Sequence, residues 1–341
     1  MNTITARTVR TQVQRIAEST SDVDELLSAA GKVIRRAVPA EGWCGFTLDP
    51  DMLVKTAGVH EAGLSPALFG HLATLEYRPG DSTRFVDLAR TGRPAAILTD
   101  HRSSERFHEI LKPSGYAHEL RMVLLDQARA WGGFVFLREP ASPPFTQTDS
   151  RFVTSLGRVL ARGVRRSLLR SQTGAGSLSA SPGLLLLDEG YQIVSMSAGT
   201  ETLLAELVER GATQPLLPAV VYALAAAVSE TAGSAPMAVR VPTRTRRWAT
   251  FHAWRLDGPV RVGVSIGSRH SDKAGEAVLE NHGLSPRERQ ITELVLRGRS
   301  TAQMADSLYL SPHTVRDHLK SIFAKTGVRS RHELVAVLLK P

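Results

Sequence analysis

The most constraining feature of this sequence is a series of helix-start signals spaced through its last 58 residues, 284–341. In a capping box, a Ser side chain and a Glu or Gln three residues later satisfy each other's backbone donors at a helix start. Proline directly after the cap is favourable because the first helical residue needs no amide donor. The start signals are, in chain order, Ser285 with Glu288, Ser300 with Gln303, Ser311 with Pro312, and Ser330 with Glu333. The pattern predicts four short helices.

Between these signals the apolar residues fall on one face of each predicted helix, as expected for a small helical bundle with a single core. Only Tyr309 and Leu310 separate the second helix from the third. That spacing is typical of a helix-turn-helix, whose second helix lies in the major groove of DNA. The apolar sets are Ile291, Leu294 and Val295; Met304, Ala305 and Leu308; Val315, Leu319, Ile322 and Phe323; and Leu334, Val335 and Leu338.

The third predicted helix carries polar side chains on the face opposite its apolar stripe. Arginine can pair with guanine through two hydrogen bonds, and lysine or threonine can reach a phosphate or a base edge. A bundle used only for dimerisation, with these charges merely solvated, is the alternative interpretation. The candidate DNA-binding residues are Thr314, Arg316, Asp317, His318 and Lys320, with Arg299 and Gln303 beside the second helix start.

Residues 284–331, LSPRERQITELVLRGRSTAQMADSLYLSPHTVRDHLKSIFAKTGVRSR, resemble the LuxR/NarL-type helix-turn-helix domain. The family pattern reads approximately L-T/S-x-R-E-x-x-V-L, then G-x-S-x-x-x-I-A, then S-x-x-T-V-K/R-x-H, and ends in K-L-x-V-x-S-R. The match runs through the whole domain without a gap but covers only about a sixth of the chain. Met304 and Thr326 depart from the usual Ile and Leu, and Asp317 stands where a neutral residue is common.

The resemblance implies roles for individual residues. It makes Glu288 a structural or contact acid of the first helix and places Thr314, Arg316 and Lys320 at positions that face the groove, with His318 at a signature position nearby. It also implies that the last helix, 331–339, is used for dimerisation on DNA. A carboxylate at Asp317 could accept a hydrogen bond from a cytosine amino group or repel phosphate, and the sequence leaves both open.

Charge and composition are compatible with a nucleic-acid partner. The 341-residue chain has a formal net charge of +9, and residues 284–341 hold ten Lys and Arg against five Asp and Glu. An excess of arginine from codon usage would give the same total, so the distribution is the stronger indication. The single cysteine, Cys44, excludes an intrachain disulfide and a cysteine zinc site. Without an apolar run of about 20 residues or a leader-like start, we expect a cytoplasmic protein with no membrane partner.

The first 170 residues predict an α+β sensor domain. Two helices are expected over 9–38, with Ser21 as the cap of the second, followed by short strands and a long helix after residue 149. The hairpin in 119–139 and the turn F-T-Q-T-D before the long helix resemble GAF domains, whose cupped sheet can hold a small ligand. The ligand-pocket candidates are Trp43, Phe46, Phe69, Tyr77, Phe85, Phe107 and Tyr116, each of which could also be an ordinary core aromatic.

A glycine- and serine-rich linker, 171–182, separates this domain from a second α+β domain over 183–270. Its opening hairpin, GLLLLDEGYQIVS, two helices and three later strands resemble a shortened PAS domain. A second linker spans 271–283, and the helix-turn-helix domain occupies 284–341. We therefore expect a multidomain chain with a GAF-like domain at 1–170, a PAS-like domain and an all-α four-helix domain; we find no internal sequence repeat.

Other chemistries find little support. A phosphoacceptor receiver domain would need an early acidic pair that is missing before Asp49 and Asp51. Gly263–Gly267 matches G-x-S-x-G around Ser265, but too little chain follows to supply the acid and the histidine of a hydrolase. Five histidines lack metal-ligand spacing, and no phosphate-binding glycine loop is present. We expect no catalytic residue, metal or cofactor. The histidines are His60, His71, His101, His108 and His118.

The function predicted from the sequence is that of a DNA-binding transcriptional regulator, acting as a homodimer on double-stranded DNA and controlled by a small-molecule ligand or partner at the N-terminal region. Two alternatives remain: a ligand-independent dimeric regulator, and an enzyme fused to a DNA-binding module. The ligand, the operator and the direction of regulation are not determined by these residues.

Overall fold

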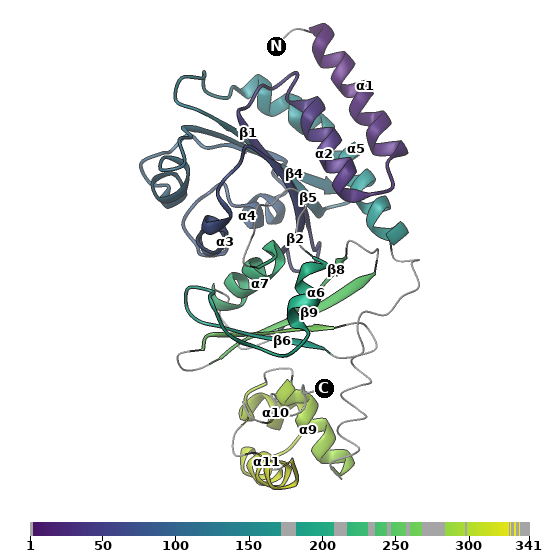
Figure 1. Cartoon of the computed structure of the whole chain (residues 1–341), viewed down its shortest axis with the longest axis vertical. Coiled ribbons are helices and arrows are strands. Elements are labelled where there is room, and N and C mark those ends of the chain that lie inside the picture. The colour runs from purple at the N-terminus through teal and green to yellow at the C-terminus, as the bar shows by residue number, and fades with distance from the viewer. Residues whose placement is uncertain are drawn as a thin grey trace. The chain divides into compact units, whose positions relative to one another are not determined.

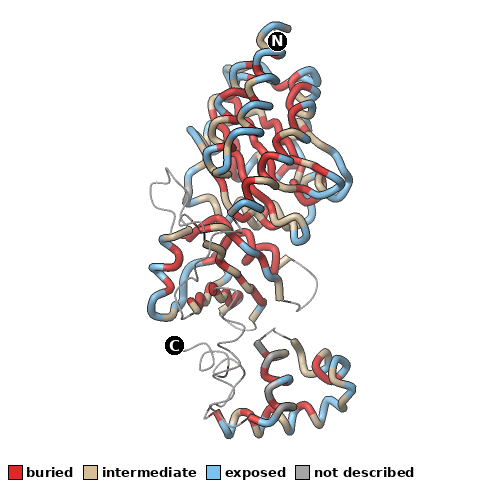
Figure 2. Tube along the Cα trace, turned by 90° about the vertical axis from the view of Figure 1, so that its right-hand side faces the viewer, coloured by how far each residue is buried: buried red, intermediate tan, exposed pale blue. Residues whose placement is uncertain are grey.

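The computed structural model describes residues 3–171, 182–207, 217–230, 236–243, 247–256, 260–267, 284–296 and 299–326, with the single residues 328, 331 and 334. Two compact units result. The first comprises Met1–Ala175 together with Leu207–Glu230, and the second holds the remaining strands and the C-terminal helices. None of the described helices has an apolar stretch long enough to cross a lipid bilayer. Figure 2 shows the buried residues lying along the helices and strands of each unit.

The first unit is built on a five-stranded antiparallel sheet in the order β2-β1-β5-β4-β3. The predicted hairpin is confirmed by the pairing of β4 with β5, which starts at Asp126 and Arg129. Its two-residue turn places Gln127 and Ala128 at positive φ, a conformation that usually selects Asn or Gly. The strands are β1 (Gly42–Leu48), β2 (Lys55–Glu61), β3 (Ala95–Ile97), β4 (His118–Asp126) and β5 (Arg129–Arg138).

Three helices cover one face of this sheet, and shorter helices lie over the other (Figure 1). Asp22, and not the predicted Ser21, caps the second helix, because its carboxylate accepts hydrogen bonds from the amides of Asp24 and Glu25 at 3.0 Å each. The covering helices are α1 (Thr3–Ser19), α2 (Val23–Ile34) and α5 (Gln147–Ser171); the shorter ones are η1 (Pro66–Leu68), α3 (Phe69–Tyr77), α4 (Phe85–Arg90) and η2 (Phe107–Leu111).

The second unit contains another five-stranded antiparallel sheet, in the order β7-β6-β10-β9-β8. Numbered from its own first strand, this is the order 2-1-5-4-3 of the first sheet. The predicted hairpin and three later strands are all present, with one helix, α6 (Thr200–Ala205), after the hairpin. The strands are β6 (Gly183–Leu187), β7 (Ile193–Met196), β8 (Met237–Pro242), β9 (Trp248–Arg255) and β10 (Val262–Gly267).

The second helix expected in the 183–270 region, α7 (Ala219–Glu230), belongs instead to the first unit. It packs against α3 and β2. Its residues from Ala219 to Val228 are all buried, because the helix is apolar around its whole circumference. The expectation of one continuous middle domain therefore does not hold for this segment.

The C-terminal helices α9 (Pro286–Leu296), α10 (Thr301–Leu308) and α11 (Pro312–Thr326) share one apolar core that includes Ile291 and Ile322. Two of the three predicted capping boxes are confirmed, at Ser285–Glu288 and at Ser300–Gln303. Tyr309 adopts a left-handed conformation between α10 and α11, which allows the short turn. The third capping pair, Ser330 and Glu333, lies outside the described residues, as does the fourth predicted helix apart from Arg331 and Leu334.

Gly31 of α2 provides a test of the packing between α2 and the sheet. A Cβ at this position would lie 2.2 Å from the buried ring of Trp43 on β1, so we expect Gly31→Ala to destabilise the first unit by about 1–3 kcal/mol. Urea unfolding followed by tryptophan fluorescence measures the change.

Gly157 of α5 is the matched control, because a Cβ there would meet its nearest neighbour at 3.5 Å, an ordinary contact. Gly157→Ala is expected to be neutral or to stabilise by up to about 1 kcal/mol, since alanine is the better helix former. Equal effects of the two substitutions would contradict the proposed close packing of Trp43 on α2.

Candidate functional site

Helix α11 presents a polar stripe to solvent. Val315, Leu319 and Ile322 are buried in the core of the three helices. Arg316 and Lys320, one helical turn apart on the opposite face, are both exposed. The structure therefore places two of the predicted contact residues on one free surface of the helix that the helix-turn-helix arrangement offers to DNA.

Asp317 has a partner that the sequence did not reveal. Its Oδ2 lies 3.0 Å from Nδ1 of His313, one turn earlier on the same exposed face. The sequence left two roles open for this carboxylate, and the contact adds a third, the positioning of the His313 ring. His313 was not among the predicted residues, although its i, i+4 spacing from Asp317 is a signal that could have identified it.

The remaining predicted residues are half-buried or take part in helix capping. Thr314 is half-buried, and its amide and hydroxyl both contact the Ser311 hydroxyl, at 3.1 and 2.9 Å. Gln303 accepts a hydrogen bond from the Ser300 amide at 3.0 Å through Oε1. His318 and Arg299 are half-buried, and the Arg299 carbonyl accepts a hydrogen bond from Arg331.

Glu288 connects the first of these helices to α11. Ser321 and Lys325 of α11 donate hydrogen bonds to its two carboxylate oxygens, each at 2.6 Å, and the Ser285 amide donates a third at 2.7 Å. Burial by itself raises the pKa of a carboxyl, but the hydrogen bonds from Lys325 and Ser321 outweigh it and lower the pKa of Glu288 to about 2. Of the two roles predicted for Glu288, the contacts describe the structural one.

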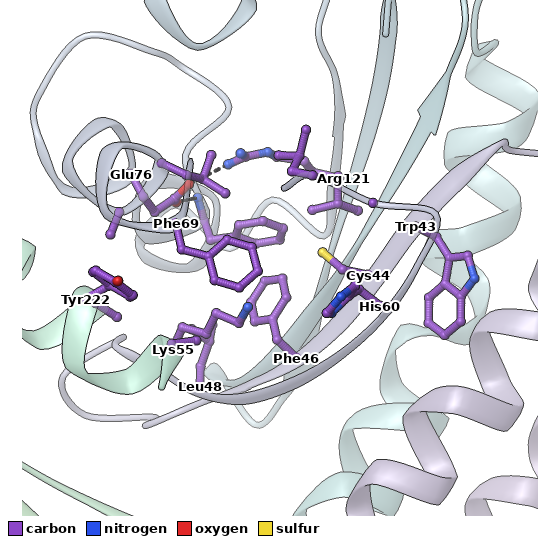
Figure 3. A pocket seen from close by; sticks show the side chains of 18 of the residues that line it. Trp43, Cys44, Phe46, Leu48, Lys55, His60, Phe69, Glu76, Arg121 and Tyr222 are labelled. Carbon is purple, nitrogen blue, oxygen red and sulfur yellow. Dashed lines mark hydrogen bonds and ion pairs between the residues drawn. The ribbon is translucent and has the colours of Figure 1, made fainter. Parts of the chain in front are cut away.

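The first unit contains a cavity of about 130 Å³ on the face of the sheet opposite α2 and α5. This size is comparable with that of an engineered cavity of about 150 Å³ that holds benzene. Its walls come from β1, β2, α3, the central strands and α7 (Figure 3). The lining is mainly apolar, with Phe46 and Phe69 near the centre and Tyr222 of α7 on one side.

Five of the seven predicted pocket aromatics line this cavity: Trp43, Phe46, Phe69, Tyr77 and Phe85. The Trp43 ring nevertheless packs toward α2 and lies apart from the others in Figure 3. Phe107 and Tyr116 are not lining residues. Phe107 stacks on His101 with ring centroids 4.4 Å apart, and the Tyr116 hydroxyl donates a hydrogen bond to the Ala62 carbonyl at 2.5 Å.

A network of charged side chains forms one wall of the cavity, and sequence reasoning missed it. Glu119 contacts Arg106 at 2.6 Å and Arg121 at 3.1 Å, and Arg121 also contacts Glu76 of α3 at 2.7 Å. Glu119 and Arg121 lie two residues apart on β4 and thus on the same face of the sheet. Their i, i+2 spacing in a predicted strand was the available signal.

The charges of this network are held in their ionised forms. Burial raises the pKa of Glu119, but Arg106 and Arg121 outweigh it and hold that pKa below its usual range. Burial lowers the pKa of Arg121, but the carboxylates of Glu119 and Glu76 outweigh it and leave that pKa raised. Asp81, which lies 3.2 Å from Arg106, has its pKa lowered to about 2. Each buried charge is thus matched by a neighbour of opposite sign.

Within the described part of the chain, the G-x-S-x-G motif around Ser265 lacks the geometry of a nucleophile site. Ser265 lies within strand β10, paired with His252 of β9, and not at the strand-to-helix turn that a nucleophile of this motif requires. Gly263 lies under Trp254, whose ring would be 2.6 Å from a Cβ, and this close approach accounts for the first glycine. Among the residues described, no three His, Cys, Asp or Glu side chains converge as metal ligands.

The comparisons with known proteins concern chiefly the C-terminal helices. The profile described as bacterial regulatory proteins, luxR family, matches residues 282–338. The spore germination protein GerE of Bacillus subtilis is 37% identical over 57 residues, which are 17% of this chain and 77% of GerE. The chain belongs to the luxR family of bacterial regulatory proteins. It is accordingly a DNA-binding transcription regulator.

Two further similarities are more limited. An HTH-type transcriptional regulator of Mycobacterium bovis is 44% identical over 52 residues, which are 15% of this luxR-family chain but only 6% of that regulator. The GAF domain of a phosphoenolpyruvate-protein phosphotransferase from Coxiella burnetii aligns with 50% of this chain and 99% of that domain, with 13% identity and a TM-score of 0.36.

Glu288 makes the stability of the luxR-family domain depend on pH. Because its pKa falls from 4.5 to about 2 on folding, its contribution of roughly 3 kcal/mol is complete above pH 4.5 and is lost as the pH falls toward 2. We expect Glu288→Gln to accelerate amide hydrogen exchange in α9 and α11 by about 100-fold at pH 7. The difference in exchange rate between Glu288→Gln and the unaltered protein should decrease at lower pH, because Glu288 itself becomes protonated there.

The control is Asp306→Asn, which removes an exposed carboxylate of α10 and should leave exchange nearly unchanged. A difference between Glu288→Gln and the unaltered protein that stays constant from pH 7 to pH 3 would contradict an ionised Glu288.

Removal of the Glu119 carboxylate, which two arginines share, should lower the free energy of unfolding more than removal of a surface carboxylate. Glu119→Gln leaves two buried arginines short of a counter-charge, and we expect it to destabilise the first unit by about 3–5 kcal/mol in thermal unfolding. Glu109→Gln, at an exposed contact with His71, is the control and should change stability by less than about 0.5 kcal/mol. Similar losses for both would show that the network is not a stabilising unit.

Proposed function

We propose that this regulator reads double-stranded DNA with α11 in the major groove and that its activity responds to the occupancy of the first-unit cavity. The exposed Arg316 and Lys320, backed by the buried stripe of the same helix, are the observation that supports DNA reading most directly. The cavity, with its aromatic lining and buried charged wall, supports a sensor role for the first unit.

Different residues are proposed to do different things on DNA. Arg316 reads a base edge, because a guanidinium can pair with guanine through two hydrogen bonds. Lys320 neutralises a phosphate, and Thr314 contacts the backbone or a base from the first turn of α11. Asp317 and His313 act as a pair, while His318, Arg299 and Gln303 lie at the margin of the interface. Their half-burial and capping contacts support a positioning role.

The architecture around this site is proposed as three domains with the boundaries expected from the sequence, apart from α7. The strand order 2-1-5-4-3 in both sheets is compatible with a GAF-like first domain and a PAS-like second one. We propose that the chain acts as a homodimer on a two-fold DNA site, since one helix-turn-helix covers only a half-site. It would work in the cytoplasm, where bacterial DNA is located, and without enzymatic activity.

DNA binding gives a direct test of the role of α11. Arg316→Ala should weaken binding to the cognate site by about 1–3 kcal/mol and relax preference at one base position. Lys320→Ala should weaken binding to all sequences alike and reduce the salt dependence by about one phosphate contact. Fluorescence-anisotropy titrations against cognate and scrambled duplexes at several salt concentrations measure both.

The charge-matched control is Arg7→Ala, because Arg7 is an exposed residue of α1 in the first unit. It should change neither affinity nor salt dependence. Equal affinity of the unaltered protein for cognate and scrambled duplexes, unaffected by Arg316→Ala, would contradict sequence-specific reading by α11.

A further inference from the structure

The helix α7 joins the ligand cavity to a different part of the chain. The chain segments before and after it, up to Glu206 and from Thr231 onward, belong to the second unit, whereas α7 packs on α3 and β2 of the first. Ten consecutive residues, Ala219–Val228, are buried. Exposure of a helix that is apolar on every side costs free energy, so α7 depends on its contacts with α3 and β2 to stay buried.

Three residues of α7, Ala219, Tyr222 and Ala223, line the cavity. They place one side of the helix directly against whatever fills the cavity. Tyr222 is 6% exposed, and it brings a phenolic hydroxyl to the α7 side of the cavity. A phenolic hydroxyl can donate and accept a hydrogen bond, so a ligand with one polar group has a hydrogen-bonding partner on this helix.

The charges around the cavity favour a neutral ligand. The lining includes two cationic side chains, Lys55 and Arg121, and two carboxylates, Glu76 and Glu119. Both carboxylates are bound to Arg121, at 2.7 and 3.1 Å, and Lys55 lies 5.6 Å from the ring centroids of both Phe46 and Phe69. A charged ligand would lose its hydration and meet a wall without net charge, whereas a neutral one loses little.

We propose that the cavity takes a neutral, mainly apolar molecule of about one ring that carries a single polar group for Tyr222, and that this molecule holds α7 in place on α3 and β2. The inference rests on the proposed sensor role of the cavity and adds the class of ligand and the element that responds. Because α7 is covalently continuous with the second unit at both ends, its docking is a route by which occupancy of the cavity reaches that unit.

The test is hydrogen exchange of the full-length protein with three probes of nearly equal shape: benzyl alcohol, benzoate and benzylammonium. Benzyl alcohol at millimolar concentration should slow exchange in α7 at least threefold, with smaller protection in α3 and β2. Peptides of α5 serve as the internal reference. Protection by benzoate or benzylammonium and not by benzyl alcohol would overturn the neutral class of ligand.

Two variants separate the parts of the proposal. Tyr222→Phe should abolish most of the protection by benzyl alcohol while leaving that by toluene intact. Ala223→Leu fills part of the cavity from α7 and should mimic the ligand, with slower exchange of α7 and a weaker response to benzyl alcohol. Unchanged α7 exchange with probe, together with unchanged or faster exchange in Ala223→Leu, would overturn the role of α7.

Failure here is distinguishable from failure of the proposed function. Protection of α3 and β2 by benzyl alcohol without protection of α7 keeps the sensor cavity and overturns only the inference about α7. No protection of any cavity element by any probe overturns the inference together with its ligand class. DNA reading by α11 is measured separately, and its outcome does not depend on either result.

Discussion

The first unit depends on the buried carboxylate of Glu119, which two arginines share. Arg106 reaches it from the segment before η2, and Arg121 reaches it from the same strand. Through Arg121 the network extends to Glu76 of α3, and through Arg106 to Asp81. One strand thus anchors two segments over the sheet through ion pairs, in addition to their apolar packing. The ion pairs, together with the apolar core that Phe85 and Leu111 share with Phe46, hold these segments over the strands that line the cavity.

The C-terminal helices were predictable because their signals are local. The capping boxes at Ser285 and Ser300 and the buried stripe of α11 depend on residues three or four positions apart, and the structure confirms them. The predicted site on α11 could likewise be found from a single helix, by separating its apolar face from its polar face. Missing were the contacts between helices, above all the hydrogen bonds from Ser321 and Lys325 to Glu288, which is more than 30 residues away.

The N-terminal region was less predictable, because its site is assembled from distant segments. Strand β2 and helices α3 and α4 are short, and their apolar residues follow no clear helical or strand period. Aromatic residues suggested a pocket, but Phe107 and Tyr116 could be separated from the other five only by tertiary packing. The two sheets share one strand order without any sequence repeat. A strand needs only side chains that alternate between its two faces, and many different residues can meet that requirement. Helix α7 was predicted as a helix, yet its all-round apolar surface could not indicate which sheet it covers.

The position of Glu288 has a consequence for the entropy of association. Its partners Ser321 and Lys325 lie in the C-terminal half of α11, whereas the exposed stripe with Arg316 begins in the N-terminal half. These hydrogen bonds fix the orientation of α11 at its C-terminal half, while Arg316 in its N-terminal half remains exposed to solvent. A recognition element that is already oriented loses less conformational freedom when it binds, and a wrong base sequence cannot be accommodated by tilting the helix. In the proposed complex with DNA, preorganisation of this kind would make a single buried carboxylate, remote from the contact surface, contribute to discrimination between sites.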